Sequence, residues 1–85
     1  MSSYFVYILK CADKTLYTGI TTDLERRVGE HNSTSMGAKY TAGRRPVVLV
    51  YSKKFKNRSR ASIEEAQIKK LKRADKLKLF ALGKA

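Results

Sequence analysis

The alternation of apolar and polar positions predicts three strands. The segment Tyr4–Lys10 (YFVYILK) is apolar at both alternating sets of positions, which is typical of a strand covered on both faces. A polar turn, ADKT, separates it from Leu16–Ile20 (LYTGI), which is rich in strand-forming residues. Because the connection is short, we expect these two strands to pair as an antiparallel hairpin. A third strand is predicted over Val47–Phe55 (VVLVYSKKF).

The period of the pattern changes after the hairpin, in the segment TTDLERRVGEHN, and predicts a helix. Leu24 and Val28 are spaced i, i+4 and mark its apolar stripe. Thr22 and Glu25 fit a capping box, and Asp23 suits the positive N-terminus of a helix. The polar segment NSTSMG that follows predicts the end of the helix.

Two further helices are predicted in the C-terminal third of the chain. The segment RASIEEAQIKKLKR follows a capping signal, NRS, and its apolar face carries Ala61, Ile68 and Leu71. A shorter helix is predicted over Asp75–Leu82. The order ββαβαα predicts one α+β domain over residues 1–85, with a small three-stranded, mainly antiparallel sheet flanked by helices.

The net charge narrows the class of partner. The 85 residues carry a formal charge of +12; residues 1–43 hold five basic and four acidic residues, and residues 44–85 hold fourteen and three. Charge runs are often only solvated lysine faces, but so large an excess on a small domain favours a polyanion, nucleic acid ahead of an anionic membrane or an acidic protein. In the loop GAKYTAGRRP, Lys39, Arg44 and Arg45 are the expected nucleic-acid contacts.

The cysteine count and the apolar runs exclude several classes of protein. A single cysteine, Cys11, excludes an intramolecular disulfide and a cysteine-based zinc cluster, and is expected to be a small core or turn residue. The start MSSYFVYILK lacks the pattern of a signal peptide, and no apolar run approaches the roughly 18 residues that span a membrane. We therefore expect a cytoplasmic protein without a membrane partner. The sequence leaves the oligomeric state open, with a monomer as the expectation.

Two polar residues interrupt the apolar stripe of the first predicted helix. On a helical wheel, Arg27 and His31 fall beside Leu24 and Val28. Arg26 and Glu30 lie on the far side. Each of the two residues on the stripe has an ordinary explanation when it is taken alone. The stem of Arg27 would cover the rim of the core while its head reaches water, and His31 would be a core histidine with satisfied hydrogen bonds.

The predicted hairpin adds three residues to this arrangement. Tyr17 and Gly19 share one face of the second strand, and a glycine inside a strand often marks the close approach of a backbone or a ligand. With Tyr7 on the first strand, they would form one polar pocket over the sheet together with the two polar residues of the helix.

A carboxylate of the second predicted helix is a candidate metal ligand, but the wheel does not select it. Glu64 and Glu65 both flank the apolar face, and the geometry slightly favours Glu64. Either carboxylate near a cationic pocket would suit a divalent cation. The alternative is a surface glutamate paired with Lys69 or another basic neighbour.

Taken in order, these segments resemble the GIY-YIG nuclease superfamily. Its two triplets match FVY and YTG, and TTDLERRVGEHN, GAKYTAGRRPVVLVY and EEAQIKKL are similar to its small stand-alone, YhbQ-like branch. The resemblance implies a DNA endonuclease or nickase that depends on Mg²⁺ or Mn²⁺ and acts in DNA repair or recombination. The alternative is a non-catalytic nucleic-acid-binding module on the same fold.

The resemblance also implies the roles of five residues. The tyrosines of the two triplets fall on Tyr7 and Tyr17, the essential arginine falls on Arg27, and a histidine that some members carry falls on His31. The metal-binding glutamate falls on Glu65. In such a site the arginine would bind phosphate oxygens, a tyrosine would activate water and the histidine would relay its proton. Because no element is evident for reading bases, we expect selection by DNA structure and not by sequence.

Overall fold

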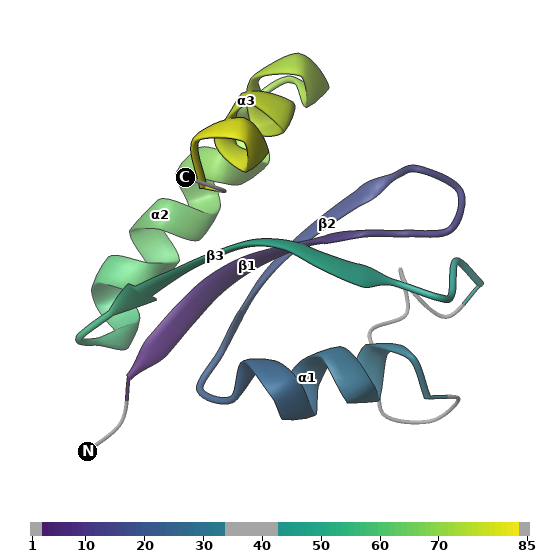
Figure 1. The fold of residues 1–85 in the computed structure, drawn as a ribbon. Helices are drawn as coiled ribbons and strands as arrows, with labels where there is room; N and C mark the ends of the chain where they lie inside the picture. The colour runs from purple at the N-terminus through teal and green to yellow at the C-terminus, as the bar shows by residue number, and fades with distance from the viewer. Residues whose placement is uncertain (1–2, 34–42, 84–85) are drawn as a thin grey trace.

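The computed structural model describes the backbone of residues 3–33 and 43–83 and the side chains of those residues up to Leu79 (Figure 1). Its elements are β1 (Tyr4–Lys10), β2 (Leu16–Thr21), α1 (Leu24–His31), β3 (Val48–Phe55), α2 (Arg58–Lys70) and α3 (Arg73–Gly83). The order ββαβαα and the α+β class are as predicted. No helix among the described residues is long and apolar enough to span a membrane.

The three strands form one antiparallel sheet in the order β2-β1-β3. The predicted hairpin is confirmed, with Tyr7 opposite Gly19 and Leu9 opposite Tyr17. On its other side β1 pairs with β3, with an irregularity between Ile8 and Leu9. As the central strand, β1 is covered on both faces, which explains why its sequence is apolar at both alternating sets of positions from Tyr4 to Leu9.

The two faces of the sheet are covered by different helices (Figure 1). One face carries α2, and its buried residues are Val6, Ile8, Ala61 and Ile68. The opposite face carries α1, and its buried residues are Tyr7, Leu9, Cys11 and Val47, with Leu24 and Val28 packed against them. Cys11 is therefore a core residue, as expected.

The start of α1 differs from the predicted capping box. The N-cap is Asp23, whose Oδ1 accepts a hydrogen bond from the backbone N–H of Arg26 at 3.1 Å. Thr22 lies one residue outside the helix. A carboxylate is favoured at this position because it accepts a hydrogen bond from an otherwise unpaired N–H of the first turn. Its negative charge also interacts favourably with the positive end of the helix.

The predicted bounds of the C-terminal helices are also corrected. The capping signal NRS is confirmed, since Asn57 is the N-cap of α2. The helix nevertheless begins at Arg58, two residues earlier than predicted, and ends at Lys70. The backbone becomes extended at Leu71, and α3 begins at Arg73. The basic segment KKLKR, which was predicted to end one helix, is therefore divided between two helices.

Candidate active site

The ring of Tyr7 lies across a glycine of the neighbouring strand. A Cβ atom added at Gly19 would be 2.5 Å from Tyr7 Oη and 2.7 Å from its Cζ. The close approach that the strand glycine predicted is therefore real, but it is made by a tyrosine side chain. Only glycine at this position lets the phenol point from the sheet towards α1.

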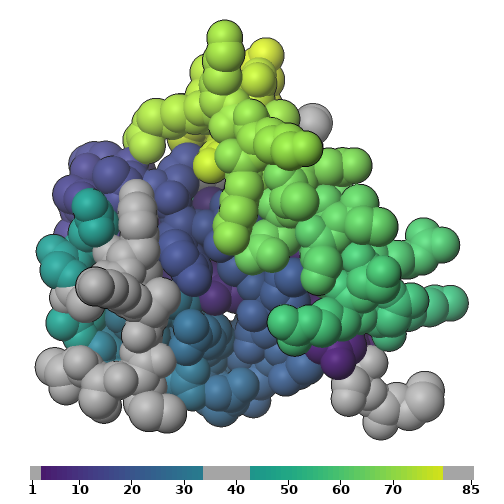
Figure 2. All heavy atoms as spheres, turned by 180° about the vertical axis from the view of Figure 1, so that it is seen from behind, coloured from purple at the N-terminus to yellow at the C-terminus, as the bar shows by residue number. Residues whose placement is uncertain are grey.

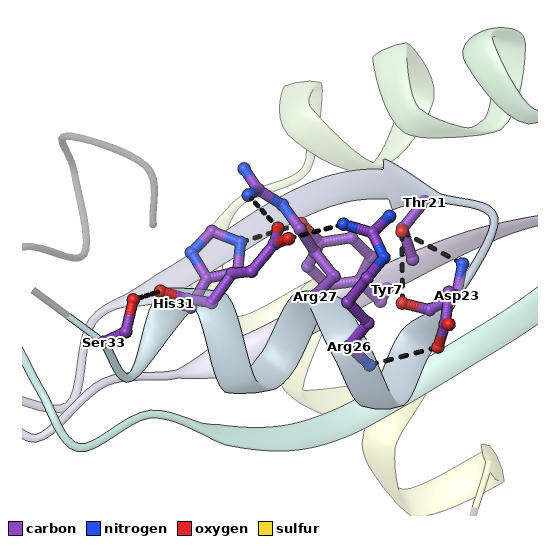
Figure 3. A network of polar contacts seen from close by, with 8 residues as sticks. Tyr7, Thr21, Asp23, Arg26, Arg27, His31 and Ser33 are labelled. Atoms are coloured by element: carbon purple, nitrogen blue, oxygen red, sulfur yellow. Dashed lines mark hydrogen bonds and ion pairs between the residues drawn. The ribbon is translucent and has the colours of Figure 1, made fainter. Parts of the chain in front are cut away.

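The predicted polar pocket is present and is built by three elements. Tyr7 Oη of β1 lies 2.9 Å from His31 Nε2 of α1 (Figure 3). The rings of Tyr17 and His31 have centroids 5.0 Å apart, and those of Tyr7 and Tyr17 are 6.4 Å apart. Arg27, one turn before His31, hydrogen-bonds the Tyr7 phenol. The structure thus brings together four of the five predicted catalytic residues.

The buried pair at the centre of this pocket is neutral at pH 7. Burial raises the pKa of Tyr7 to about 12, although the hydrogen bond from Arg27 opposes the shift. Burial and, next, the charge of Arg27 lower the pKa of His31 to about 4. Because Tyr7 Oη accepts a hydrogen bond from Arg27, its own proton is best directed at His31 Nε2, which gives a chain from arginine to phenol to imidazole.

Glu30 is a member of the site that the sequence did not suggest. Arg27 donates to its Oε1 at 2.8 Å, and Arg26 donates to its other oxygen. The wheel placed Glu30 on the far side, but its side chain is only 15% exposed. The hydrogen bond from Arg27 lowers the pKa of Glu30 and keeps it ionised. The i, i+3 and i, i+4 spacing to the two arginines was the available signal.

An open groove of about 340 Å³ lies beside the pocket. In Figure 2 a hollow separates the green residues of α2 from the blue residues of β2 and α1. The groove is lined by Tyr4, Ile20, Thr21, Thr22, Arg26, Arg27, Glu30 and Arg58. Arg27 and Glu30 belong both to this lining and to the interactions of the pocket, whereas Tyr7 and His31 do not line the groove. Three guanidinium groups against one carboxylate make the groove suitable for an anion.

The structure separates the two glutamates that the wheel left open. The negative charge of Glu65 contributes to the raised pKa of Tyr7, after burial, whereas Glu64 acts on Tyr51. Glu65 is therefore the carboxylate within electrostatic reach of the pocket. Its side chain is 25% exposed, and its Oε2 lies 3.3 Å from Lys69 Nζ. No group of three or more histidine, cysteine or acidic side chains suited to a metal ion occurs within residues 3–33 and 43–79.

Two of the three predicted nucleic-acid contacts of the loop, Arg44 and Arg45, lie among the described residues. Lys39 falls outside the described residues. Arg44 Nε donates to Asp13 Oδ2 at 2.9 Å, and the guanidinium of Arg45 donates to the carbonyl oxygen of Ser33. These contacts tie the segment before β3 to the hairpin turn and to the end of α1. Their role in binding nucleic acid stays a prediction.

Comparison with known proteins accounts for this arrangement. The sequence profile of the GIY-YIG catalytic domain matches residues 3–78. The chain belongs to the GIY-YIG family. Within it, the chain is 56% identical to a UPF0213 protein of Syntrophus aciditrophicus, over 94% of this chain and 92% of that protein. A UPF0213 protein of Staphylococcus haemolyticus is 51% identical, over 94% and 96% of the two chains.

Two solved structures share the GIY-YIG fold seen here. A solution structure of a protein from E. faecalis has a TM-score of 0.64 and 47% identity, and covers 96% of this chain and 90% of that one. A UPF0213 protein from Bacillus halodurans has a TM-score of 0.61 and 42% identity, over 94% and 84%. These small relatives agree with the predicted stand-alone, YhbQ-like branch.

Proposed function

We propose that this GIY-YIG domain is a divalent-metal-dependent DNA endonuclease or nickase that acts in DNA repair or recombination. The observation that carries the proposal is the position of Arg27, which is held by Glu30 and Tyr7 where the tyrosine–histidine pocket meets the positively charged groove. A guanidinium fork matches two phosphate oxygens and neutralises the charge that develops on them during hydrolysis.

The two tyrosines have different tasks in this mechanism. Tyr7 is 1% exposed and has a pKa of about 12, so it keeps its proton and positions Arg27 and His31 through hydrogen bonds. Tyr17 is half-buried and lies against the His31 ring. We assign to Tyr17 the contact with the attacking water, which it orients through its hydroxyl group.

The carboxylate of Glu65 would hold the metal ion. Mg²⁺ usually keeps several waters and binds one or two carboxylates together with substrate phosphates, so a lone carboxylate fits an ion shared with DNA. The exposed ion pair with Lys69 is a weak competitor, since such pairs contribute about 0–1 kcal/mol. Bound there, Mg²⁺ or Mn²⁺ would supply Lewis acidity that stabilises the leaving oxygen.

The substrate is expected to be selected by its structure. The groove presents arginines, which bind phosphates and so position DNA without reading its sequence. No described element is spare for insertion into a DNA groove, because each helix packs on or beside the sheet. Branched, flapped or nicked DNA is therefore the expected substrate.

The test is cleavage of branched, flapped, nicked and linear DNA with Mg²⁺, Mn²⁺ or EDTA. Glu65→Gln keeps the size of the side chain and removes its charge, so it should lower cleavage by at least about 10²-fold and preserve DNA binding. Glu64→Gln is the matched control on the same helix and should cut normally. If Glu64→Gln is the inactive variant, the carboxylate is wrongly assigned. If the wild type binds these DNAs and cuts none of them, the protein is a binding module.

A further inference from the structure

One arginine of the groove has no individual role in the proposed mechanism. Arg58 is the first residue of α2 and lines the groove from the side opposite α1. Arg26 and Arg27 share the charge of Glu30. The side chain of Arg58 makes no ion pair or hydrogen bond with any residue that the structure describes. Its positive charge is therefore available to an anion that enters the groove.

The position of Arg58 on α2 relates it to the proposed site of cleavage. Seven residues, or about two turns, separate Arg58 from Glu65, so both lie on one side of the helix, about 10 Å apart along its axis. A DNA strand with its scissile phosphate between Glu65 and Arg27 would reach Arg58 by following this side of α2. A second phosphate of the same strand is the anion that would meet it.

The size and lining of the groove favour an unpaired strand. Its volume of about 340 Å³ is at the lower end of the range for small-ligand clefts, which suits one nucleotide. Tyr4 contributes a half-buried aromatic ring to the wall. Arginines that hold the backbone beside an aromatic ring that stacks a base are the combination used by single-strand binding proteins.

We propose that Arg58, together with Arg26 and Tyr4, binds an unpaired nucleotide next to the scissile bond. The groove then selects DNA that carries a single-stranded segment at the cut. The place of the scissile bond in this proposal rests on the proposed nuclease function, whereas the binding of an unpaired strand by the groove does not.

Binding measurements without metal test the proposal. Fluorescence anisotropy in EDTA would compare a blunt duplex with the same duplex carrying a single-stranded tail. The wild type should bind the tailed DNA more tightly. Arg58→Ala should weaken binding of the tailed DNA about tenfold, as expected for a lost charge-assisted hydrogen bond, and change blunt-duplex binding less than about twofold. The salt dependence on tailed DNA should fall by about 0.7 in log–log slope.

Arg60→Ala is the matched control. Arg60 is an exposed arginine two residues further on, on roughly the opposite side of α2, so its removal deletes the same charge away from the groove. It should leave the preference for tailed DNA unchanged. Equal losses for Arg58→Ala and Arg60→Ala, or equal losses on tailed and blunt DNA for Arg58→Ala, would overturn the proposal.

The two proposals fail separately. A protein that cuts DNA but shows no Arg58-dependent preference for the tail retains the nuclease function and loses this inference. A protein that shows the preference and never cuts DNA retains this inference about binding and loses the nuclease function.

Discussion

Gly19→Ala tests how the pocket is built, because the added methyl group would collide with Tyr7. The new Cβ would lie 2.5 Å from Tyr7 Oη and 2.7 Å from Cζ. Carbon atoms in contact are about 3.5–4.0 Å apart, so the phenol has to move by about 1 Å. It has little room for this movement, since Tyr7 is 1% exposed and its Oη is hydrogen-bonded to His31.

The cost of this movement has two parts. Forcing an extra methyl group into a well-filled core costs about 1–3 kcal/mol. Displacing the phenol also breaks its buried hydrogen bond to His31, which costs about 1 kcal/mol more. We expect Gly19→Ala to lower the free energy of unfolding by about 2–4 kcal/mol, a large part of the stability of a small domain.

Thermal and denaturant unfolding followed by circular dichroism would measure this effect. For a domain of this size about 1 kcal/mol corresponds to about 4–8 °C, so the Tm should fall by about 8–32 °C. Gly29→Ala is the matched control, since a Cβ at this exposed position of α1 would meet no atom within 4 Å. Because alanine is the better helix former, Gly29→Ala should raise stability by about 0.5–1 kcal/mol.

The stability of Gly19→Ala also provides the result that would refute this reasoning. If Gly19→Ala unfolds within about 0.5 kcal/mol of the wild type, which is the usual range of surface substitutions, the Tyr7 ring does not occupy the space above Gly19. The geometry described for the pocket would then be wrong, whatever the protein does to DNA.

Three further predictions concern the residues of the pocket. The pKa of His31 is about 6.5 in the unfolded chain and about 4 in the folded chain. The free energy of unfolding should therefore fall by about 3 kcal/mol as the pH falls between these two values. Denaturant titrations at stepped pH would measure this loss, and His31→Gln should remove it. Tyr17→Phe should lower the cleavage rate by about 10²-fold or more and leave the free energy of unfolding nearly unchanged. Tyr7→Phe should lower the free energy of unfolding by about 1–3 kcal/mol, because it removes the hydrogen bond to a buried imidazole nitrogen. Arg27→Lys should lower the cleavage rate by about 10²–10³-fold with less than tenfold effect on DNA affinity, because it keeps the charge and loses the fork.

The sequence predicted the sheet better than it predicted the ends of the helices. A strand that is apolar on both sides has to be central in a small antiparallel sheet, and β1 is. The start of α1 was harder, because Thr22 and Asp23 are adjacent and either side chain can cap a helix. In the structure Asp23 is the N-cap, and the Thr21 hydroxyl accepts a hydrogen bond from its backbone N–H at 3.1 Å.

The different surroundings of Glu64 and Glu65 depend on tertiary structure. A helical wheel gives the direction of a side chain relative to its own helix, but not which strand or pocket lies in that direction. In the fold, the charge of Glu64 acts on Tyr51 and that of Glu65 on Tyr7. The distinction depends on how α2 lies over the sheet, and nothing in the local sequence specifies this.

The sequence could have identified Glu30 as a site residue if the wheel had been used to look for an ionic partner of Arg27. The wheel grouped residues by hydrophobicity and placed this glutamate with the solvent-facing side chains. However, an arginine on an apolar stripe requires an anion, because burying an unpaired guanidinium costs several kcal/mol. Two carboxylates lie within helical reach of Arg27: Asp23, four residues before it, and Glu30, three residues after it. In the structure Asp23 caps the helix, and Glu30 accepts the hydrogen bond from Arg27.

The same requirement explains why the polar residues of α1 occur together. Arg27 is stabilised on the stripe by Glu30 and by the phenol of Tyr7, and its charge in turn helps to keep His31 neutral. The neutral imidazole is then able to accept a hydrogen bond from the phenol O–H, which leaves the phenol oxygen to accept a hydrogen bond from Arg27. Glu30, Arg27, Tyr7 and His31 therefore form one chain of hydrogen bonds. Removing any one of them takes away a hydrogen-bond partner from the next. Double replacements within this set should therefore cost less than the sum of the single ones.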